Sequence, residues 1–346
     1  SIDSNKIFQV LLYRLKKLFS SRPLQATYSV YENHFKKIFG KNPSNADIAA
    51  AAQSVLEKFV IDIVTYNRKY LDSNNICLAG GTAANVLVNQ RVSEIAGVKN
   101  IFIFPNMGDG GLAVGAALLE YFNHDQKVPT SAPKNFFIGT KPNTVDLEKK
   151  LKAHSMQYHV FKDESELVKI AAEFLKNEKV LGIMRGRMEF GPRALCHRSI
   201  LASPREKNIN FLLNRRLNRT EFMPFAPVVL DKKLKLIFPD LKCQKPAKYM
   251  TITAKVDPKF WEVIPAVVHI DGTARPQYVD NENDPFIYAL LEKYESITKI
   301  PALINTSFNV HEEPIVCDVE DALRGFLSGV LDALIIEQFF IFGFKS

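Results

Sequence analysis

Residues Gly182–Arg205 read GIMRGRMEFGPRALCHRSILASPR. The apolar run Lys179–Met184 leads into this stretch and predicts a short buried strand. Five arginines fall within what we expect to be one loop and the beginning of a helix: Arg185, Arg187, Arg193, Arg198 and Arg205. Gly186, Gly191 and Pro192 interrupt regular structure between them, so the sequence predicts a shaped turn.

This arginine-rich stretch is suited to binding an oxyanion. Glycine lets the backbone approach a ligand closely, and a guanidinium group binds phosphate or carboxylate oxygens two at a time. We therefore interpret the stretch as a loop that binds phosphate-bearing substrates. The alternative is an exposed basic surface that pairs with nearby acidic residues, although such surfaces seldom carry interleaved glycine, proline and apolar residues.

The composition is that of a globular protein with room for two or more domains. The chain has 346 residues, of which 47% are hydrophobic and 24% charged, and no apolar run reaches the roughly 18 residues of a membrane span. It begins Ser-Ile-Asp-Ser, without an initiator methionine or a signal peptide, so we expect a fragment or a trimmed chain. The net charge of +8 fits an anionic ligand, weak nucleic-acid binding, or no particular partner.

The cysteines and histidines argue against a zinc site or a disulfide framework. The four cysteines lie far apart and form no Cys-x-x-Cys pair: Cys77, Cys196, Cys243 and Cys317. The seven histidines show no metal-type pairing either. A reducing cytoplasm is therefore the expected location.

Alternating helices and strands over residues 46–121 predict an α/β domain. Its first strand, Asn75–Ala79, is followed by a double glycine, Gly80 and Gly81, and by a helix beginning near Asn85. A strand, a glycine turn and a helix N-terminus can hold phosphate through backbone N–H groups. The double glycine could equally serve only tight packing between strand and helix.

A second predicted strand, Ile101–Phe104, leads into another glycine-rich turn, Pro105–Gly111. Asp109 lies between glycines at the carboxyl end of this strand, where open α/β sheets place ligand-binding residues. Its carboxylate could bind a metal ion, a ribose hydroxyl or an amide. The alternative is an Asx turn or a helix N-cap.

Residues 123–141 are rich in proline, lysine and serine and are interpreted as a linker to a second α/β domain, which contains the arginine-rich stretch. Within this domain, residues 232–248 are expected to be an irregular surface loop, and 249–256 a strand. Val267–Arg275 is expected to be a strand that runs into a polar turn, and Ala302–Asn309 a strand ending in amides and hydroxyls.

Both of these later strands end in groups that could bind a substrate. The first offers acid–base, acceptor and anion-binding groups, at His269, Asp271, Thr273 and Arg275. The second offers ligands for an amide-like or nucleotide substrate, at Asn305, Ser307 and Asn309. The alternatives are a hydrogen-bonded core histidine in the first case and turn chemistry in the second.

Five blocks in this order resemble the NodU/CmcH O-carbamoyltransferases: LAGGTAAN (78–85), GDGG (108–111), GRMEFGPRAL (186–195), HIDGTAR (269–275) and NTSFN (305–309). The resemblance runs from about Asn45 to Ile336. It implies an α/β protein in which residues 1–130 form part of an ASKHA-type domain (actin/Hsp70-like, ribonuclease H-like). Residues 131–346 would form a YrdC-like α/β domain with a twisted mixed sheet.

The resemblance also implies a reaction. The YrdC-like part would make carbamoyl adenylate and pyrophosphate from carbamoyl phosphate and ATP, the latter with Mg(II). The ASKHA-type part would transfer the carbamoyl group to a hydroxyl of a sugar or natural-product acceptor, aided by Fe(II). We expect a cytoplasmic protein that could form a homodimer. The lack of a long apolar run argues against a membrane, and the GRMEFGPRAL and HIDGTAR blocks argue against nucleic acid as partner.

Site residues follow from the matching blocks. The resemblance implies catalytic groups that bind the phosphate compounds at Arg187, Arg193, Arg198, Arg205, His269 and Arg275. It implies substrate-orienting side chains at Asn305, Ser307 and Asn309. It places the nucleotide beside Gly80, Gly81, Asn85 and Gly110, and the metal at Asp109.

The chain also departs from the family pattern. It lacks the His-x-x-x-His-like pair of the metal site and begins near the middle of the ASKHA-type domain, so we expect a fragment that lacks half of the acceptor site. Many members have glycine where Cys196 stands. Two alternatives stay open: an enzyme that makes or transfers threonylcarbamoyl groups on tRNA, and a non-catalytic nucleotide-binding module.

Overall fold

The computed structural model describes residues 44–71, 73–126, 133–218, 225–309 and 313–344. The sequence also predicts a basic amphipathic helix over residues 7–20, and these residues lie outside the described ranges. The chain divides into two units, residues 1–74 with 91–98, and residues 75–90 with 99–346. In none of the described ranges is a helix both long enough and apolar enough to cross a bilayer.

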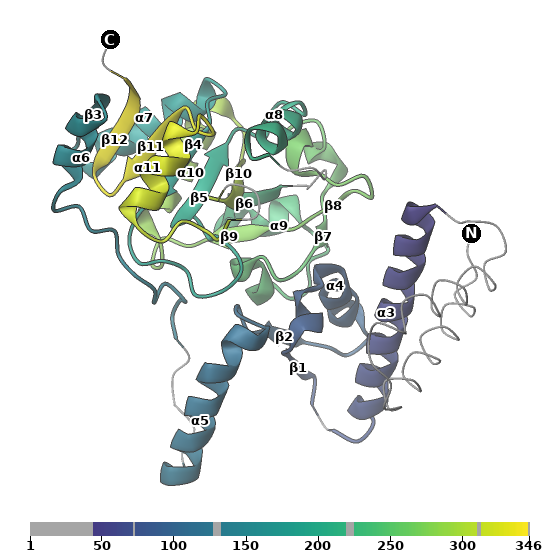
Figure 1. Ribbon diagram of the computed structural model, residues 1–346. Coiled ribbons are helices and arrows are strands. Elements are labelled where there is room, and N and C mark those ends of the chain that lie inside the picture. The colour runs from purple at the N-terminus through teal and green to yellow at the C-terminus, as the bar shows by residue number, and fades with distance from the viewer. Residues whose placement is uncertain (1–43, 72, 127–132, 219–224, 310–312, 345–346) are drawn as a thin grey trace. The chain divides into compact units, whose positions relative to one another are not determined.

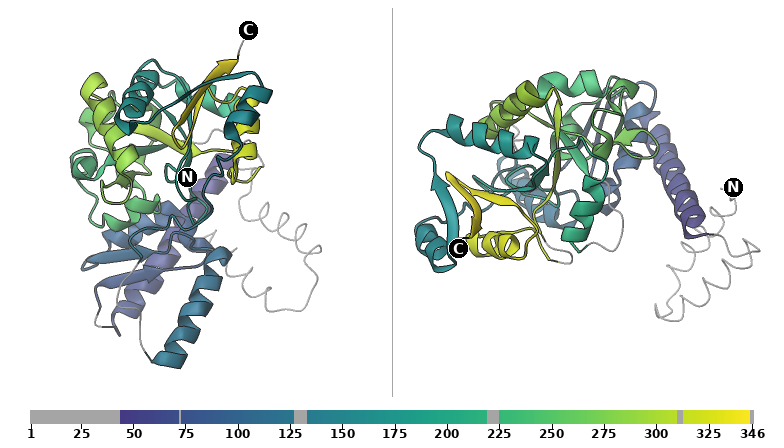
Figure 2. Two further views of the ribbon diagram at one scale, coloured as in Figure 1. Left: turned by 90° about the vertical axis from the view of Figure 1, so that its left-hand side faces the viewer. Right: turned by 90° about the horizontal axis from the view of Figure 1, so that it is seen from above.

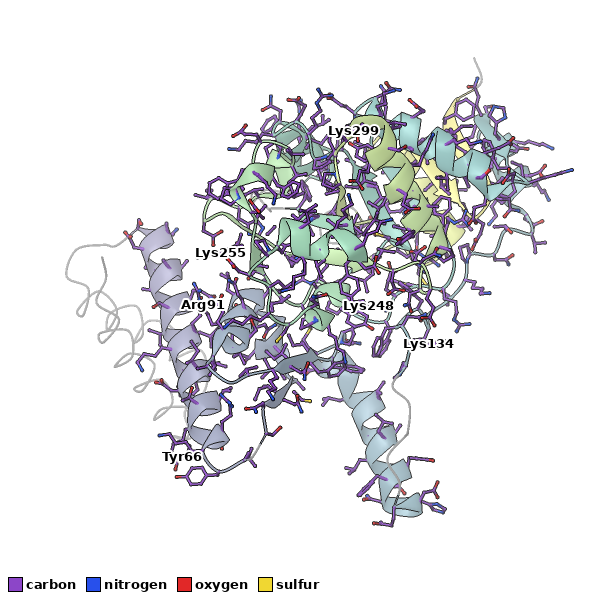
Figure 3. The ribbon with its side chains drawn as sticks, turned by 180° about the vertical axis from the view of Figure 1, so that it is seen from behind. Tyr66, Arg91, Lys134, Lys248, Lys255 and Lys299 are labelled. Atoms are coloured by element: carbon purple, nitrogen blue, oxygen red, sulfur yellow. The ribbon has the colours of Figure 1, made fainter. Side chains whose placement is uncertain are left out.

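The described part of the first unit is built around helix α3 (Asn45–Arg68), within the region where the sequence predicts alternating helices and strands. Ser44 caps this helix by accepting a hydrogen bond from the N–H of Asp47 at 3.1 Å. At the other end, the Arg68 guanidinium donates to the carbonyl of Ala96 at 2.7 Å. Arg91, which is labelled in Figure 3, forms an ion pair with Glu57 of α3 at 3.1 Å. These polar contacts join the two sequence segments of the unit.

The core of the second unit is an eight-stranded mixed sheet in the order β3-β12-β11-β4-β5-β10-β6-β9 (Figure 1). Its strands are β3 (Met156–Val160), β4 (Leu181–Met184), β5 (Arg198–Ala202), β6 (Ala226–Leu230), β9 (Gln277–Val279), β10 (Ala302–Ser307), β11 (Ala333–Ile336) and β12 (Phe339–Phe344). The pairs β4–β11 and β6–β9 are parallel, and the others are antiparallel. The mixed sheet predicted for this part of the chain is confirmed.

Helices cover both faces of this sheet. They are α6 (Leu147–Ala153), α7 (Glu164–Lys176), α8 (Ile209–Arg216), α9 (Asp231–Ile237), α10 (Pro285–Thr298) and α11 (Val319–Leu327). Helices α7 and α10 pack against each other on one face, and α11 lies on the opposite face (Figure 2). Strand β4 is therefore buried along its whole length, which explains its uninterrupted apolar sequence.

A small parallel sheet precedes this core. Strands β1 (Asn75–Leu78) and β2 (Asn100–Ile103) pair in parallel and lead, through the short 3-10 turns η1 (Gly81–Ala84) and η2 (Asp109–Gly111), into α4 (Val86–Glu94) and α5 (Leu112–Asp125). Because parallel strands end at the same edge, both glycine-rich turns lie together. The N–H of Gly80 donates to the carbonyl of Met107 at 2.7 Å and ties the two turns.

Four predictions of secondary structure are wrong. Residues 232–248 contain α9 and the 3-10 turn η3 (Lys245–Tyr249), because Leu234 and Ile237 bury one side of a lysine-rich helix. The strand predicted over 249–256 shrinks to β7 (Ala254–Lys255), which pairs with β8 (Thr273–Ala274), since Met250 adopts a left-handed φ of 55°. The arginine-rich stretch ends in strand β5 and begins no helix. Within Val267–Arg275, where a strand running into a polar turn is expected, the only strand is β8, and the 3-10 turn η5 (Pro265–Val267) precedes it.

One buried amide joins α4 to the larger part of this unit. The Nδ2 of Asn89, which is fully buried, donates to the carbonyls of Ala83 and Thr251, both at 2.7 Å. We predict that Asn89→Ala lowers the free energy of unfolding by about 2 kcal/mol, because two buried carbonyls lose their donor. Urea unfolding measures this value.

The control is Asn123→Ala, an exposed position on α5, which should change the free energy of unfolding by less than about 0.5 kcal/mol. Equal effects of the two substitutions would contradict the role given to Asn89.

Candidate functional site

A cavity of about 350 Å³ opens in the second unit where β10, the arginine-rich loop and the turn before β8 meet. Its lining residues are Val86, Pro192, Arg193, Ala194, Met250, His269, Arg275, Asn305, Thr306 and Ser307. The volume lies within the usual range of small-molecule sites. The fold thus brings together five of the residues that the sequence singles out, and they come from three separated motifs: Arg193, His269, Arg275, Asn305 and Ser307.

A buried carboxylate holds the loop that carries Arg193. Glu189 is 6% exposed, and its Oε1 accepts hydrogen bonds from three backbone N–H groups. The donors are Leu195 at 2.6 Å, His197 at 2.8 Å and Arg198 at 3.1 Å. One carboxylate oxygen therefore closes residues 189–198 into a compact loop, in the way that capping residues satisfy the end of a helix.

Glycine is required at the tip of this loop. Gly191 has a φ of 147°, and a Cβ atom there would lie 2.9 Å from the carbonyl oxygen of Pro105. The close approach packs the loop against the turn that follows β2. Cys196 also has a left-handed φ, 81°, in a fully buried position, a conformation that is uncommon for residues other than glycine.

Arg193 lies at the cavity without a carboxylate partner. Its side chain is half-buried, and burial lowers the pKa of its guanidinium. In the part of the chain that the structure describes, Arg193 has no ion pair. A partly desolvated cation of this kind favours a bound anion, because the anion would supply the charge that the protein does not. Arg275 adds a second guanidinium to the same cavity.

The other predicted arginines lie elsewhere. Arg187 is exposed and donates to the carbonyl of Ile138 at 2.7 Å. Arg198 is fully buried at the beginning of β5 and donates to the carbonyls of Arg185, Gly186, His197 and Thr140. Arg205 is exposed beyond the end of β5. The structure therefore does not gather four guanidinium groups of the stretch around one hollow.

His269 is set up as a neutral imidazole with a defined tautomer. Its Nδ1 lies 3.0 Å from Oγ1 of Thr273, whose hydroxyl donates to Asp271 at 2.7 Å. Because that hydroxyl proton is engaged, Nδ1 carries the donated proton and Nε2 is left as an acceptor. Burial lowers the pKa of His269, and the charge of Arg275 acts in the same direction, so the ring is neutral at neutral pH.

Strand β10 supplies the polar wall of the cavity. Asn305 and Ser307 are two residues apart and so lie on the same face of the strand. Asn305 is 1% exposed, and its Nδ2 donates to the carbonyl of Ala194 at 3.1 Å. Asn309 is outside the cavity lining, and its Nδ2 donates to the carbonyl of Glu313 at 3.0 Å.

The predicted nucleotide-binding residues lie at the shared edge of β1 and β2. Gly80 has a φ of 93°, Gly81 begins η1, and Gly110 lies in η2 beside the side chain of Asn106. Asn85 caps α4, because its Oδ1 accepts a hydrogen bond from the N–H of Val88 at 3.1 Å. The next residue, Val86, lines the cavity.

Asp109 is exposed in η2. Across the residues that the structure describes, no group of three or more histidine, cysteine, aspartate or glutamate side chains is placed to hold a metal ion. The residues present therefore do not by themselves form a metal site around Asp109.

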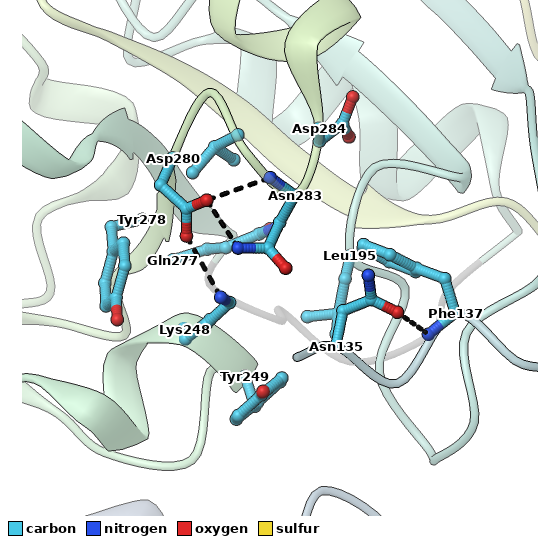
Figure 4. Close-up of a pocket in the computed structure, with 11 residues that line it drawn as sticks. Asn135, Phe137, Leu195, Lys248, Tyr249, Gln277, Tyr278, Asp280, Asn283 and Asp284 are labelled. Carbon is cyan, nitrogen blue, oxygen red and sulfur yellow. Dashed lines mark hydrogen bonds and ion pairs between the residues drawn. The ribbon is translucent and has the colours of Figure 1, made fainter. Parts of the chain in front are cut away.

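A second hollow, of about 20 Å³, lies next to the cavity wall and has the size of a single water molecule (Figure 4). In it, Asp280 accepts hydrogen bonds from Lys248 at 3.0 Å and from the N–H of Asn283 at 2.9 Å. Gln277 lines this hollow and also contacts Asn305, so it belongs to the wall between the two. The hollow is too small for a substrate.

Three residues of this site have no signal in the sequence motifs. Glu189 lies within the GRMEFGPRAL block, but its position there does not indicate that its carboxylate accepts hydrogen bonds from backbone N–H groups. Gln277 contacts Asn305 of the cavity wall, and the N–H of His197 donates to Glu189, which holds the loop. His197 stacks on Phe137 at 3.7 Å and lies 3.4 Å from the carboxylate of Asp284.

The carboxylate of Glu189 generates the first prediction for the site. Glu189→Ala leaves three backbone N–H groups without an acceptor, so we expect the free energy of unfolding to fall by about 3 kcal/mol. Glu189→Gln keeps an acceptor oxygen and should cost less than half as much. Urea unfolding measures both, with exposed Glu206→Ala as the control. A loss below about 0.5 kcal/mol in Glu189→Ala would contradict the account.

His197 generates a pH-dependent prediction. Burial alone lowers its pKa, but the ion pair with Asp284 and the charge of Glu189 outweigh burial and raise it. A raised folded-state pKa adds stability that is fully present below the ordinary histidine pKa and is lost as the pH rises through the raised value. We therefore expect His197→Gln to cost more free energy of unfolding at about pH 5.5 than at about pH 9.

Unfolding by urea at the two pH values tests this expectation, and the exposed His154→Gln serves as control for the substitution itself. A cost that grows with pH would show that the charged form of His197 does not stabilise the fold.

Comparison with known proteins places these features in a family. Residues 5–118 match the family model described as carbamoyltransferase N-terminus, and residues 172–342 match carbamoyltransferase C-terminus. The nodulation protein NolO of Bradyrhizobium diazoefficiens is 33% identical over 299 residues, which is 85% of this chain and 54% of that protein. An uncharacterised protein of Synechocystis is 37% identical over 320 residues, which is 85% of this chain and 51% of that protein.

The chain spans about half the length of the curated relatives it matches. A crystal structure of full-length HypF in a phosphate- and nucleotide-bound form is 19% identical, covering 54% of this chain and 22% of that one, with a TM-score of 0.35. A score this low carries no argument about function. The matches to both the N-terminal and the C-terminal family models show that this chain belongs to the carbamoyltransferase family.

Proposed function

We propose that this chain carries the carbamoyl-adenylate-forming part of an O-carbamoyltransferase, in a YrdC-like domain that follows part of an ASKHA-type transfer domain. The observation that carries the proposal is Arg193, a half-buried guanidinium at a cavity it shares with Arg275, with no ion pair among the residues described. A pair of guanidinium groups at a small polar cavity suits an acyl phosphate, because the phosphate supplies the missing negative charge.

The reaction balances with water as a reactant. Water cleaves carbamoyl phosphate, so that inorganic phosphate leaves and carbamate remains. A carbamate oxygen then attacks the α-phosphorus of ATP, the bond to the β-phosphate breaks, and pyrophosphate leaves. The products are carbamoyl adenylate, pyrophosphate and phosphate. Both steps concentrate negative charge, so fixed cations lower their barriers.

The cavity residues take roles that fit this chemistry. Arg193 and Arg275 bind the phosphate oxygens, and Ser307 offers a hydroxyl from β10. The Nε2 of His269 accepts a proton from the attacking water, since its Nδ1 is held by Thr273. The lowered pKa of His269 keeps this acceptor available at neutral pH.

The nucleotide part of the proposal rests on the two glycine-rich turns. Gly80, Gly81, Asn85 and Gly110 would contact carbamoyl adenylate through backbone N–H groups and the beginning of α4. Support comes from Val86, which follows Asn85 and lines the cavity that contains Arg193. The product of adenylation would therefore have a short path to the transfer site.

The second half-reaction would transfer the carbamoyl group to a small molecule. A hydroxyl oxygen of the acceptor attacks the carbamoyl carbon, and AMP leaves. Relatives named as nodulation proteins are compatible with a small-molecule hydroxyl acceptor. We assign no step to iron, because Asp109 lies in no three-ligand cluster of the described residues, and Mg(II) would enter with the phosphates of ATP.

Exchange of labelled pyrophosphate into ATP, dependent on carbamoyl phosphate, tests this function. We expect exchange in the wild type and a loss of kcat/KM of about 100-fold or more in Arg193→Ala, because that guanidinium stabilises developing phosphate charge. The control is Arg324→Ala, an exposed arginine on α11 that pairs with Asp321. It should retain wild-type exchange.

ATP binding without any exchange in folded wild-type protein would contradict the proposal and favour a non-catalytic nucleotide-binding module. Binding of tRNA that weakens steeply with salt would favour the threonylcarbamoyl alternative.

A further inference from the structure

One buried amide at the cavity has an acceptor atom that the protein does not satisfy. Asn305 lies in β10, pairs with Leu201 of β5 and Ala226 of β6, and is 1% exposed. It nevertheless lines the cavity beside Arg193. Its Oδ1 has no hydrogen-bond partner among the residues that the structure describes. A buried acceptor in that state is costly unless a ligand supplies a donor.

The orientation of this amide is fixed. Its Nδ2 donates to the backbone carbonyl of Ala194 at 3.1 Å and to Oε1 of Gln277 at 2.5 Å. A backbone carbonyl can only accept, so the nitrogen must face Ala194. Oε1 of Gln277 also lies 3.6 Å from the Cys196 thiol, which can donate to it. Oδ1 of Asn305 is therefore the atom of this amide that is left without a partner, in a residue that lines the cavity.

This acceptor lies next to the phosphate-binding groups of the proposed function, on which the inference rests. Ala194, which Asn305 contacts, directly follows Arg193 in the loop. Carbamoyl phosphate is a short molecule with a phosphate at one end and an amide at the other, so a phosphate held by the guanidinium groups puts the amide near this wall. The amide NH2 has two protons to donate, and an acetyl group has a methyl in the same place.

We propose that Oδ1 of Asn305 accepts a hydrogen bond from the carbamoyl NH2, and that this bond makes the cavity selective for carbamoyl phosphate over acetyl phosphate. The two acyl phosphates have almost the same shape and the same phosphate. Shape and charge alone would separate them weakly. A site built to accept from an N–H group rejects the methyl analogue strongly, because the buried oxygen is then left unpaired.

Two stable analogues test the selectivity without any need for turnover. Phosphonoacetamide replaces the bridging oxygen of carbamoyl phosphate with a methylene, and acetonylphosphonate does the same for acetyl phosphate. Calorimetric titration of the wild-type protein should show phosphonoacetamide binding at least about 10-fold more tightly. Asn305→Ala and the near-isosteric Asn305→Leu should both reduce this ratio to below about threefold.

The ratio of the affinities for the two analogues isolates the contribution of Oδ1 of Asn305. Loss of the bond to Ala194 could shift Arg193, but that shift would weaken both analogues alike. The matched control is Asn210→Ala in α8, where a buried amide donates to the carbonyl of Ala266 at 2.8 Å and its Oδ1 is also unpartnered within the described chain. Asn210 is not part of the cavity lining, so the ratio should stay at the wild-type value.

The outcomes separate this inference from the proposed function. Equal affinity of the wild type for the two analogues, or a wild-type ratio in folded Asn305 variants, would overturn the selectivity while leaving carbamoyl phosphate as substrate. Failure of the wild type to bind either analogue would overturn both. Pyrophosphate exchange in the wild type, measured separately, reports on the function alone.

Discussion

The site depends on one carboxylate oxygen that three backbone N–H groups share. Oε1 of Glu189 gathers the N–H groups of Leu195, His197 and Arg198 and so fixes both ends of a loop that has no regular structure of its own. Charge-assisted hydrogen bonds in a buried environment are strong, so the loop is held much as a helix end is held by its cap. These hydrogen bonds to Glu189 hold the loop in the conformation that positions Arg193 at the cavity.

The environment of each arginine depends on whether backbone carbonyls near it accept hydrogen bonds from its guanidinium group. Arg198 enters the core at the beginning of β5, where four carbonyl groups surround its guanidinium, so its charge is solvated by the protein. Arg187 points outward and supports the segment near Ile138. Arg193 lines the cavity beside β10, where an anion would balance its charge. Of the arginines clustered in the sequence, we thus propose Arg193 as a binding group, whereas Arg187 and Arg198 donate to backbone carbonyls.

Sequence patterns predict those features that depend on local order. The strands before each glycine turn and strands β4 and β10 follow from runs of apolar residues. The convergence of Arg193, His269, Arg275, Asn305 and Ser307 follows from the family motifs, although these are far apart in the chain. Features that depend on tertiary structure are not predicted from the sequence. Strand β5 pairs with both β4 and β10, and this pairing buries Arg198. The lysine-rich helix α9 has one buried apolar side. The sequence also does not show that Glu189 accepts hydrogen bonds from the loop backbone, because a glutamate within a basic motif suggests an ion pair instead.

The central claim is that the loop closed by Glu189 presents Arg193, together with Arg275, as the phosphate site. The most direct measurement is a crystal structure of the protein with phosphonoacetamide. The account predicts that the phosphonate lies against the guanidinium groups of Arg193 and Arg275 and that the amide lies at the wall formed by β10. A phosphonate bound instead at the exposed Arg187 or Arg205, with the cavity left to solvent, would contradict it.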